Sequence, residues 1–108
     1  MKRGDIVTVS APGDYGKPRP AVVVQSDWLG GTDSVLVSLM TSMLRDTPIF
    51  RLTIEPLPET GLRVVSQIMV DKILALPREK CGPPIGRIDD GSVLALNRML
   101  SVILGLAD

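Results

Sequence analysis

Short runs of branched aliphatic residues, separated by glycine and proline, are the feature that most limits how this chain can fold. The longest apolar runs are four residues, as in Ala21–Val24, whereas a helix needs roughly 20 to cross a bilayer. Hydrophobic residues make up 44% of the chain and aromatic residues only 3%, so Val, Leu, Ile and Met must form the core. Because branched aliphatic residues favour strands, the sequence predicts a soluble, mainly β protein.

The runs divide the chain into short strands and loops. Strands are expected at residues 5–9, 20–25, 34–40, 51–54, 64–70 and 73–76, the last as a continuation of the one before it. Pro20 lacks an amide hydrogen and therefore belongs at the first residue of its strand. Residues 26–31 can form one helical turn, capped by Ser26 or Asp27.

The end of the chain changes from a strand period to a helix period. Asp89-Asp90-Gly91-Ser92 supplies capping residues and negative charge. Val93, Leu96, Leu100 and Ile103 follow at helical spacing. The apolar arc is wider than one sheet face requires, which leaves a stripe that could join a second subunit. A chain of this length can bury roughly 65% of its unfolded surface, so we expect residues 1–108 to form one domain.

Polar residues stand at the ends of three expected strands. Gly16-Lys17-Pro18-Arg19-Pro20 opens one apolar run, Thr41-Ser42 closes a second and Asp71-Lys72 closes a third. Because the three strands can belong to one sheet, we expect these ends to converge on a single concave face. Taken singly, such motifs are also typical of a solvated turn, a strand cap or an exposed ion pair. Together they suit a phosphodiester.

Charge and composition limit the chemistry. Twelve basic and twelve acidic residues give a formal net charge of zero, so any contact with nucleic acid must be local. The chain has no histidine, so the commonest general base is missing and a metal site of the usual histidine or cysteine kind is excluded. No cofactor is expected.

The single cysteine and the first residues point to a compartment. Cys81 has no partner for an internal disulfide, and we expect it to be an inert loop thiol. Residues 1–5 lack the apolar stretch of a secretion signal. The expected compartment is therefore the cytoplasm.

One reaction suits the residue types that remain. In RNA the 2′-hydroxyl can attack its own phosphate, so the enzyme has to hold the strand in line, stabilise the phosphorane and move two protons. The guanidinium of Arg19 matches two phosphate oxygens, and Thr41 can donate a hydrogen bond to the same oxygens. Arginine has a pKa of about 12 or more and therefore transfers protons slowly. A water molecule or Asp71 is the alternative for one of the two proton transfers.

The order and spacing of these segments resemble the MazF/PemK family of toxin endoribonucleases from bacterial toxin–antitoxin pairs. The resemblance covers nearly the whole chain, and its first block is the specific part. The matching segments are residues 3–7 and 16–27, then Thr41-Ser42, Gly61-Leu62, Ser66-Gln67, residues 70–73 and Leu104-Gly105-Leu106.

The resemblance implies a fold, an activity and partners. The fold would be a mainly β, SH3-like barrel of the CcdB/MazF/PemK type with a C-terminal helix. The activity would be metal-independent cleavage of single-stranded mRNA at a short sequence by a homodimer. An antitoxin would silence the enzyme with an acidic, largely disordered tail, and operator DNA would be bound only by the toxin–antitoxin complex.

The resemblance also implies roles for residues. Arg19 and Thr41 match the family's catalytic arginine and threonine. RNA-binding roles are implied for Asp14, Tyr15 and Lys17 in the loop from Gly13 to Lys17, and for Ser42, Asp71 and Lys72.

Two departures from the family pattern and two other classes of function stay open at this stage. Met69 stands where some members have an arginine, and the chain is less basic than most members, which predicts weaker RNA affinity or more reliance on the dimer groove.

A CcdB-like toxin would poison DNA gyrase instead, but it depends on an aromatic residue near the C-terminus, and this chain ends LGLAD. A fold that only represses transcription or has lost activity is opposed by the intact Arg19 and Thr41.

Overall fold

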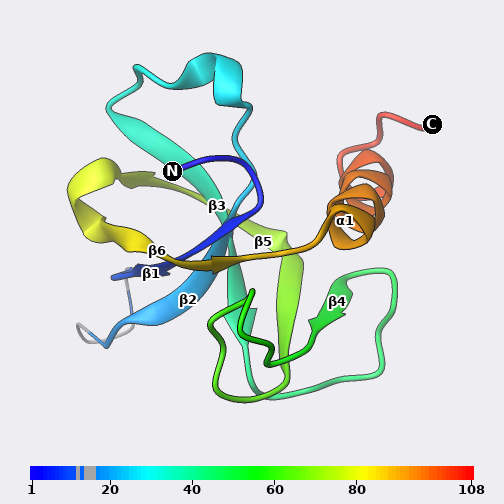
Figure 1. The fold of residues 1–108 in the computed structure, drawn as a ribbon. Helices are drawn as coiled ribbons and strands as arrows, with labels where there is room; N and C mark the ends of the chain where they lie inside the picture. Colours follow the sequence, from blue (N-terminus) through cyan, green and yellow to red (C-terminus); the bar gives the residue numbers. More distant parts are fainter. Residues whose placement is uncertain (12, 14–16) are drawn as a thin grey trace.

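Six antiparallel strands, two short 3₁₀ helices (η1 and η2) and one C-terminal α-helix are the regular elements of the part of the chain that the structure describes (Figure 1). The computed structural model describes residues 1–11, 13 and 17–108. The strand order is β4-β5-β3-β2-β1-β6. The elements are β1 (Asp5–Val9), β2 (Arg19–Val23), η1 (Asp27–Leu29), β3 (Ser34–Thr41), β4 (Arg51–Ile54), β5 (Ser66–Pro77), η2 (Arg78–Lys80), β6 (Cys81–Arg87) and α1 (Asp90–Ile103).

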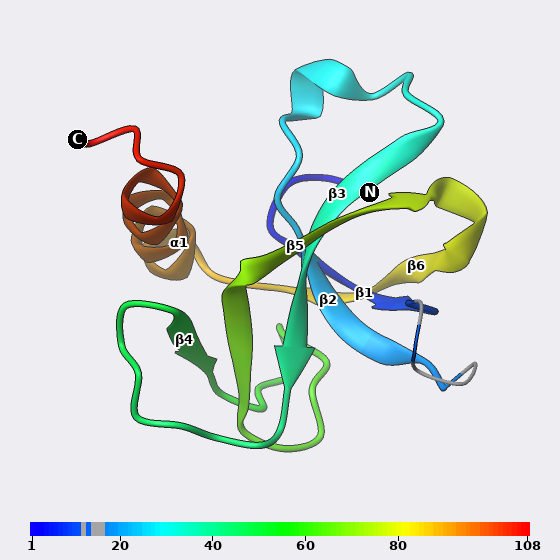
Figure 2. The same cartoon turned by 180° about the vertical axis from the view of Figure 1, so that it is seen from behind.

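Strand β5 changes direction near its middle, as Figure 2 shows from behind. Met40 of β3 pairs with Ile68, whereas Ser38 pairs with Ile73. Residues 69–72 of β5 therefore lie opposite the single residue Leu39. Such an irregularity bends a strand and increases its local twist, which lets the sheet curve around its core.

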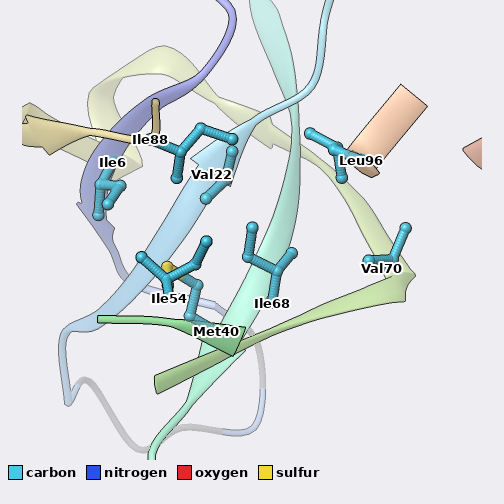
Figure 3. Close-up of a cluster of buried hydrophobic side chains, with 8 residues drawn as sticks. All are labelled: Ile6, Val22, Met40, Ile54, Ile68, Val70, Ile88 and Leu96. Carbon is cyan, nitrogen blue, oxygen red and sulfur yellow. The ribbon is translucent and has the colours of Figure 1, made fainter. Parts of the chain in front are cut away.

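The core has two clusters on opposite faces of β1 and β2, because neighbouring residues of a strand point to opposite sides. Ile6 and Val22 belong to the first cluster, whereas Val7 and Ala21 belong to the second. Figure 3 shows the first cluster, whose eight members face a common interior and include Leu96 of α1. Helix α1 thus covers one side of the bent sheet.

Helix α1 begins where the sequence predicts it. The carboxylate of Asp89 accepts a hydrogen bond from the amide of Ser92 at 2.6 Å, and this bond lowers the pKa of Asp89. Leu96 is fully buried, whereas Leu94 and Val102 on the outer face are 58% and 57% exposed. Within the described residues, no helix combines the length and apolar character needed to cross a membrane.

The start of β2 differs from the prediction. The strand covers Arg19–Val23 instead of residues 20–25, so Pro20 is its second residue and not its first. Pro20 pairs with Thr8 of β1, whereas the pairing of β2 with β3 begins only at Ala21 and Leu39. The missing amide hydrogen of Pro20 therefore costs no ladder bond.

The expected continuation of residues 64–70 by residues 73–76 is confirmed, because both belong to one strand, β5, but that strand begins at Ser66 and ends at Pro77. Strand β6 was missed because its sequence CGPPIGR contains two glycines and two prolines, and Cys81 is its first residue instead of a loop thiol. Because β6 is an edge strand that pairs with β1 through register shifts, it tolerates proline. Burial raises the pKa of the Cys81 thiol.

Candidate active site

Arg19 and Thr41 are brought together by the pairing of β2 and β3. Arg19 is the first residue of β2 and Thr41 the last residue of β3. In this antiparallel pair Ala21 lies opposite Leu39. The same register, continued by two residues on each strand, places Arg19 across from Thr41. Neither position needs an unusual backbone, because both are ordinary ends of strands.

These two ends open into a cavity of about 730 Å³. Part of the lining comes from β2 and the end of β3, and another part comes from the segment that precedes β5. The lining residues are Thr8, Pro18, Arg19, Pro20, Met40, Thr41, Ser42, Met43, Gly61, Leu62, Arg63, Val64, Ser66 and Ile85. The predicted convergence of the first two polar ends is therefore correct.

The hydroxyl of Thr41 is held at the start of a turn. Its oxygen accepts a hydrogen bond from the amide of Met43 at 3.1 Å. A hydroxyl that accepts one bond still has its own hydrogen to donate. Thr41 is half-buried and Ser42 is exposed, so a bound anion can reach both side chains.

The loop after Ser42 is fixed by Gln67 of β5, which is only 7% exposed. The amide of Arg45 donates to Gln67 Oε1 at 3.0 Å, and Gln67 Nε2 donates to the carbonyl of Arg45 at 3.0 Å. Arg51 Nη1 donates both to Gln67 Oε1 at 3.2 Å and to the carbonyl of Met43 at 3.1 Å. Gln67 therefore positions the loop that follows the Thr41-Ser42 end of β3.

Comparison with known proteins identifies the family. Residues 2–104 match the PemK-like, MazF-like toxins of type II toxin–antitoxin systems. A relative from Mycolicibacterium smegmatis (strain ATCC 700084 / mc(2)155), called probable endoribonuclease MazF, is 43% identical over 108 residues, which is 99% of each chain. The chain belongs to this family. The expected resemblance is thus confirmed.

Solved structures show the MazF-like fold at lower sequence identity. An endoribonuclease in complex with its cognate antitoxin, from a mycobacterial species, has a TM-score of 0.83 at 20% identity and covers 98% of this chain and 96% of that chain. The Mycobacterium tuberculosis toxin MazF-mt6 has a TM-score of 0.81 at 18% identity, over 94% and 96%. The predicted mainly β fold with a C-terminal helix is confirmed.

Asp71 and Lys72 do not join the Arg19 cavity of this MazF-like toxin, so the predicted convergence is wrong for the third polar end. The two residues do not close a strand. They lie in the irregular middle of β5, where four residues oppose one. Both are exposed, and Lys72 Nζ is 3.7 Å from Asp71 Oδ2.

Asp71 and Lys72 instead line a second hollow of about 180 Å³. Its other lining residues are Arg45, Thr47, Phe50, Arg51 and Met69. Met69, which stands in place of the arginine of some members, faces this hollow and not the cavity of Arg19. Asp71 is therefore not placed to take the proton step left open beside Arg19. RNA contact at Asp71 and Lys72 stays a prediction.

The predicted RNA-binding loop is described only in part. Asp14 and Tyr15 lie outside the described residues. Lys17 is exposed next to Pro18, which lines the Arg19 cavity. Lys17 is thus beside the cavity of the toxin, and its RNA contact stays a prediction.

Sequence reasoning missed two residues of the site. Gln67 was recognised only as part of a matching segment, and Arg63 was not singled out. The signal for Gln67 is a polar side chain in a strand of apolar neighbours, and no sequence pattern marks Arg63. Among the described residues, no three His, Cys, Asp or Glu side chains gather where they could hold a metal ion.

Proposed function

We propose that this MazF/PemK-family toxin cleaves single-stranded mRNA by internal attack of a 2′-hydroxyl on the adjacent phosphate, without a metal ion. Family membership and the 43% identical relative called probable endoribonuclease MazF support endoribonuclease activity. The observation that carries the mechanism is the cavity shared by Arg19 and Thr41. We also propose that residues 1–108 act as a single toxin domain in the cytoplasm.

The proposed step needs no nucleophile from the protein. The 2′-oxygen forms a bond to phosphorus and loses its proton, the bond from phosphorus to the 5′-oxygen breaks, and that oxygen gains a proton. The products are a 2′,3′-cyclic phosphate and a 5′-hydroxyl. Negative charge grows on the non-bridging oxygens, and donors placed around those oxygens lower the barrier.

Arg19 and Thr41 suit those donors. The guanidinium of Arg19 binds two oxygens at once and adds a full positive charge, and the Thr41 hydroxyl supplies a neutral donor. Ser42 lines the same cavity, and Lys17 is next to its rim, so both are proposed to bind the strand on either side. The assignment of general base and general acid stays open, with water as one candidate.

The proposed partners follow from an exposed apolar surface and from the relatives. Leu94 and Val102 of α1 are exposed, and so are Leu104 and Leu106 beyond the helix. We propose that this outer face of α1 joins a second copy of the chain. A structural relative is an endoribonuclease in complex with its cognate antitoxin, which supports an antitoxin as a partner of this chain. We propose that this antitoxin silences the toxin and that operator DNA is bound only by the complex of the two.

The test is RNA cleavage by purified protein. Wild-type protein is incubated with a long RNA in EDTA, and the new ends are mapped. We expect cleavage at a short sequence, and a loss of about 10³-fold or more in rate for Arg19→Ala. The control is Lys2→Ala. Lys2 is close in sequence to Gly4, whose amide donates to the carbonyl of Val23. Val23 is at the other end of β2 from Arg19.

Three results would contradict the proposal. Cleavage by Arg19→Ala at the wild-type rate would exclude the role of Arg19. Cleavage that stops in EDTA and returns with Mg²⁺ would exclude the metal-independent step. Intact RNA under both conditions, with gyrase inhibited instead, would favour a CcdB-like toxin.

A further inference from the structure

The large cavity is positively charged although the chain as a whole is neutral. Its described lining includes two arginines, Arg19 and Arg63, and no aspartate or glutamate. The whole chain has twelve basic and twelve acidic residues. Charge of one sign inside a concave surface attracts ligands of the opposite charge more strongly than the same residues do on an open surface. The cavity therefore favours negatively charged ligands.

Arg63 lines the same cavity as Arg19 but comes from the segment between β4 and β5. That segment has a fixed backbone. Gly61 has a φ of +69°, and a Cβ atom there would overlap the carbonyl of Ile85 in β6. The buried Thr60 hydroxyl accepts a hydrogen bond from the Leu57 amide at 3.0 Å.

The same hydroxyl donates to the carbonyl of Glu55 at 2.9 Å. The amide of Arg87 in β6 donates to the carbonyl of Glu59 at 2.8 Å. The backbone that carries Arg63 is therefore tied both to itself and to β6, so the position of its Cα atom is set before any ligand arrives.

The side chain of Arg63 is exposed. Within residues 1–11, 13 and 17–108, no hydrogen bond or ion pair engages its guanidinium. Arg51, in contrast, serves the fold, because its guanidinium donates to Gln67 and to the Met43 carbonyl. Arg63 has no comparable structural task, so its charge is available to a ligand in the cavity.

We propose that Arg63 binds the phosphate next to the one cleaved at Arg19, and so positions the RNA strand across the cavity. Two guanidinium groups that line one cavity from separate segments can each bind one of two successive phosphates of a strand. This inference rests on the proposed function. Arg63 is a positioning residue, because it acts on a phosphate that does not react.

The experiment compares Arg63→Gln, Arg63→Lys and the control Lys2→Gln, which also removes one positive charge. The probe is a fluorescein-labelled single-stranded RNA of mixed sequence with 2′-O-methyl sugars, which keeps its phosphates and cannot be cleaved. Fluorescence anisotropy gives Kd between about 50 and 200 mM KCl. For Arg63→Gln we expect roughly tenfold weaker binding and a salt slope smaller by about 0.7.

Arg63→Lys is expected to keep the salt slope, and Lys2→Gln to behave as wild type. In cleavage of the mapped RNA, Arg63→Gln should raise KM about tenfold with kcat within about threefold, because a contact made equally in the ground and transition states changes KM alone. Arg19→Ala should instead lower kcat. A merely structural role for Arg63 would lower the melting temperature and leave the salt slope intact.

The outcomes separate the two proposals. Unchanged slope and KM in Arg63→Gln would overturn the role of Arg63 while wild-type cleavage still supports the proposed function. Wild-type protein that binds the probe but cleaves no RNA would refute the proposed function, and the slope would still decide the role of Arg63. Polyglutamate is added to the cleavage assay as a probe for an acidic protein partner. If it inhibits wild type but not Arg63→Gln, while RNA binding is the same in both, Arg63 belongs to an acidic protein partner and the proposal is overturned. A wild type that binds no RNA would also overturn it.

Discussion

Arg19 meets Thr41 across two paired strands, so the geometry of this pair depends on the register of β2 and β3. A slip of one residue would turn every side chain of a strand to the other face. The buried residues Ala21 and Val23 of β2 hold that register, since both belong to the second core cluster. Packing of these small apolar residues thus sets the position of a polar pair at the strand ends.

Gly61 provides a prediction for a single residue. Gly61→Ala should destabilise the fold by about 2 kcal/mol or more, because alanine is strained at a φ of +69° and its Cβ would overlap the Ile85 carbonyl. Urea unfolding followed by circular dichroism measures this change. The control is Gly31→Ala, where a Cβ meets open space and the change should stay under about 1 kcal/mol. Equal stability of the two variants would show that the segment is not fixed as described.

The loop between β3 and β4 illustrates how one element holds another. It carries Ser42 and Met43 on its cavity side and Arg45 on the side of the second hollow. Its backbone at Arg45 is bonded through both its amide and its carbonyl to the side chain of Gln67 in β5. The side chain of Gln67 therefore holds this loop with the kind of bonds that backbone groups make between paired strands.

Gln67→Ala is predicted to loosen this loop. Because Gln67 is buried, the groups that bond its side-chain amide lose their hydrogen-bond partner in the variant. The free energy of unfolding should fall by about 1–3 kcal/mol. The loop should open more often, so trypsin should cleave after Arg45 several times faster than in wild type. Urea unfolding and limited proteolysis measure the two effects. The control Asn97→Ala removes an exposed amide from α1 and should leave both nearly unchanged. Protection of Arg45 in Gln67→Ala would refute the positioning role.

At the scale of the whole molecule, the cationic cavity and the outer face of α1 are formed by different elements. The cationic cavity lies at the ends of β2 and β3, whereas the outer face of α1 presents exposed Leu94 and Val102. A contiguous exposed apolar patch marks a surface that binds another protein, and the proposed dimer interface treats the outer face of α1 as such a patch. With this arrangement, the proposed second copy would bind at the helix while the proposed RNA substrate enters the cavity.

Leu94→Glu is predicted to weaken the proposed homodimer. A charge placed in an apolar interface loses hydration without gaining a partner, so the dimer Kd should rise about 30-fold or more. Sedimentation equilibrium over a range of concentrations measures it. Leu29→Glu alters a leucine of similar exposure, 51%, on η1 and should leave the dimer intact. A monomeric wild type, or a Leu94→Glu protein that dimerises as well as wild type, would contradict this interface.

The residue pattern predicted the helix and the positions of most strands, since a helix period, a strand period and a capping aspartate are local properties. It failed at β6, because prolines and glycines normally exclude a strand and are tolerated here only at an edge with shifted register. It also placed Asp71-Lys72 at the end of a strand, because exposed charges are typical of strand ends, whereas β5 continues through both residues.

The sequence by itself determined the fold class, the family and the residue types available for chemistry, because apolar period, motif spacing and the lack of histidine can be read along the chain. Only the tertiary structure decided which polar groups share a cavity. Strand register places Arg19 across from Thr41, and Arg63 lines the same cavity from a distant segment. Asp71 and Lys72 line another hollow. Register and bulges arise from pairing between residues far apart in the chain, so no local pattern contains them.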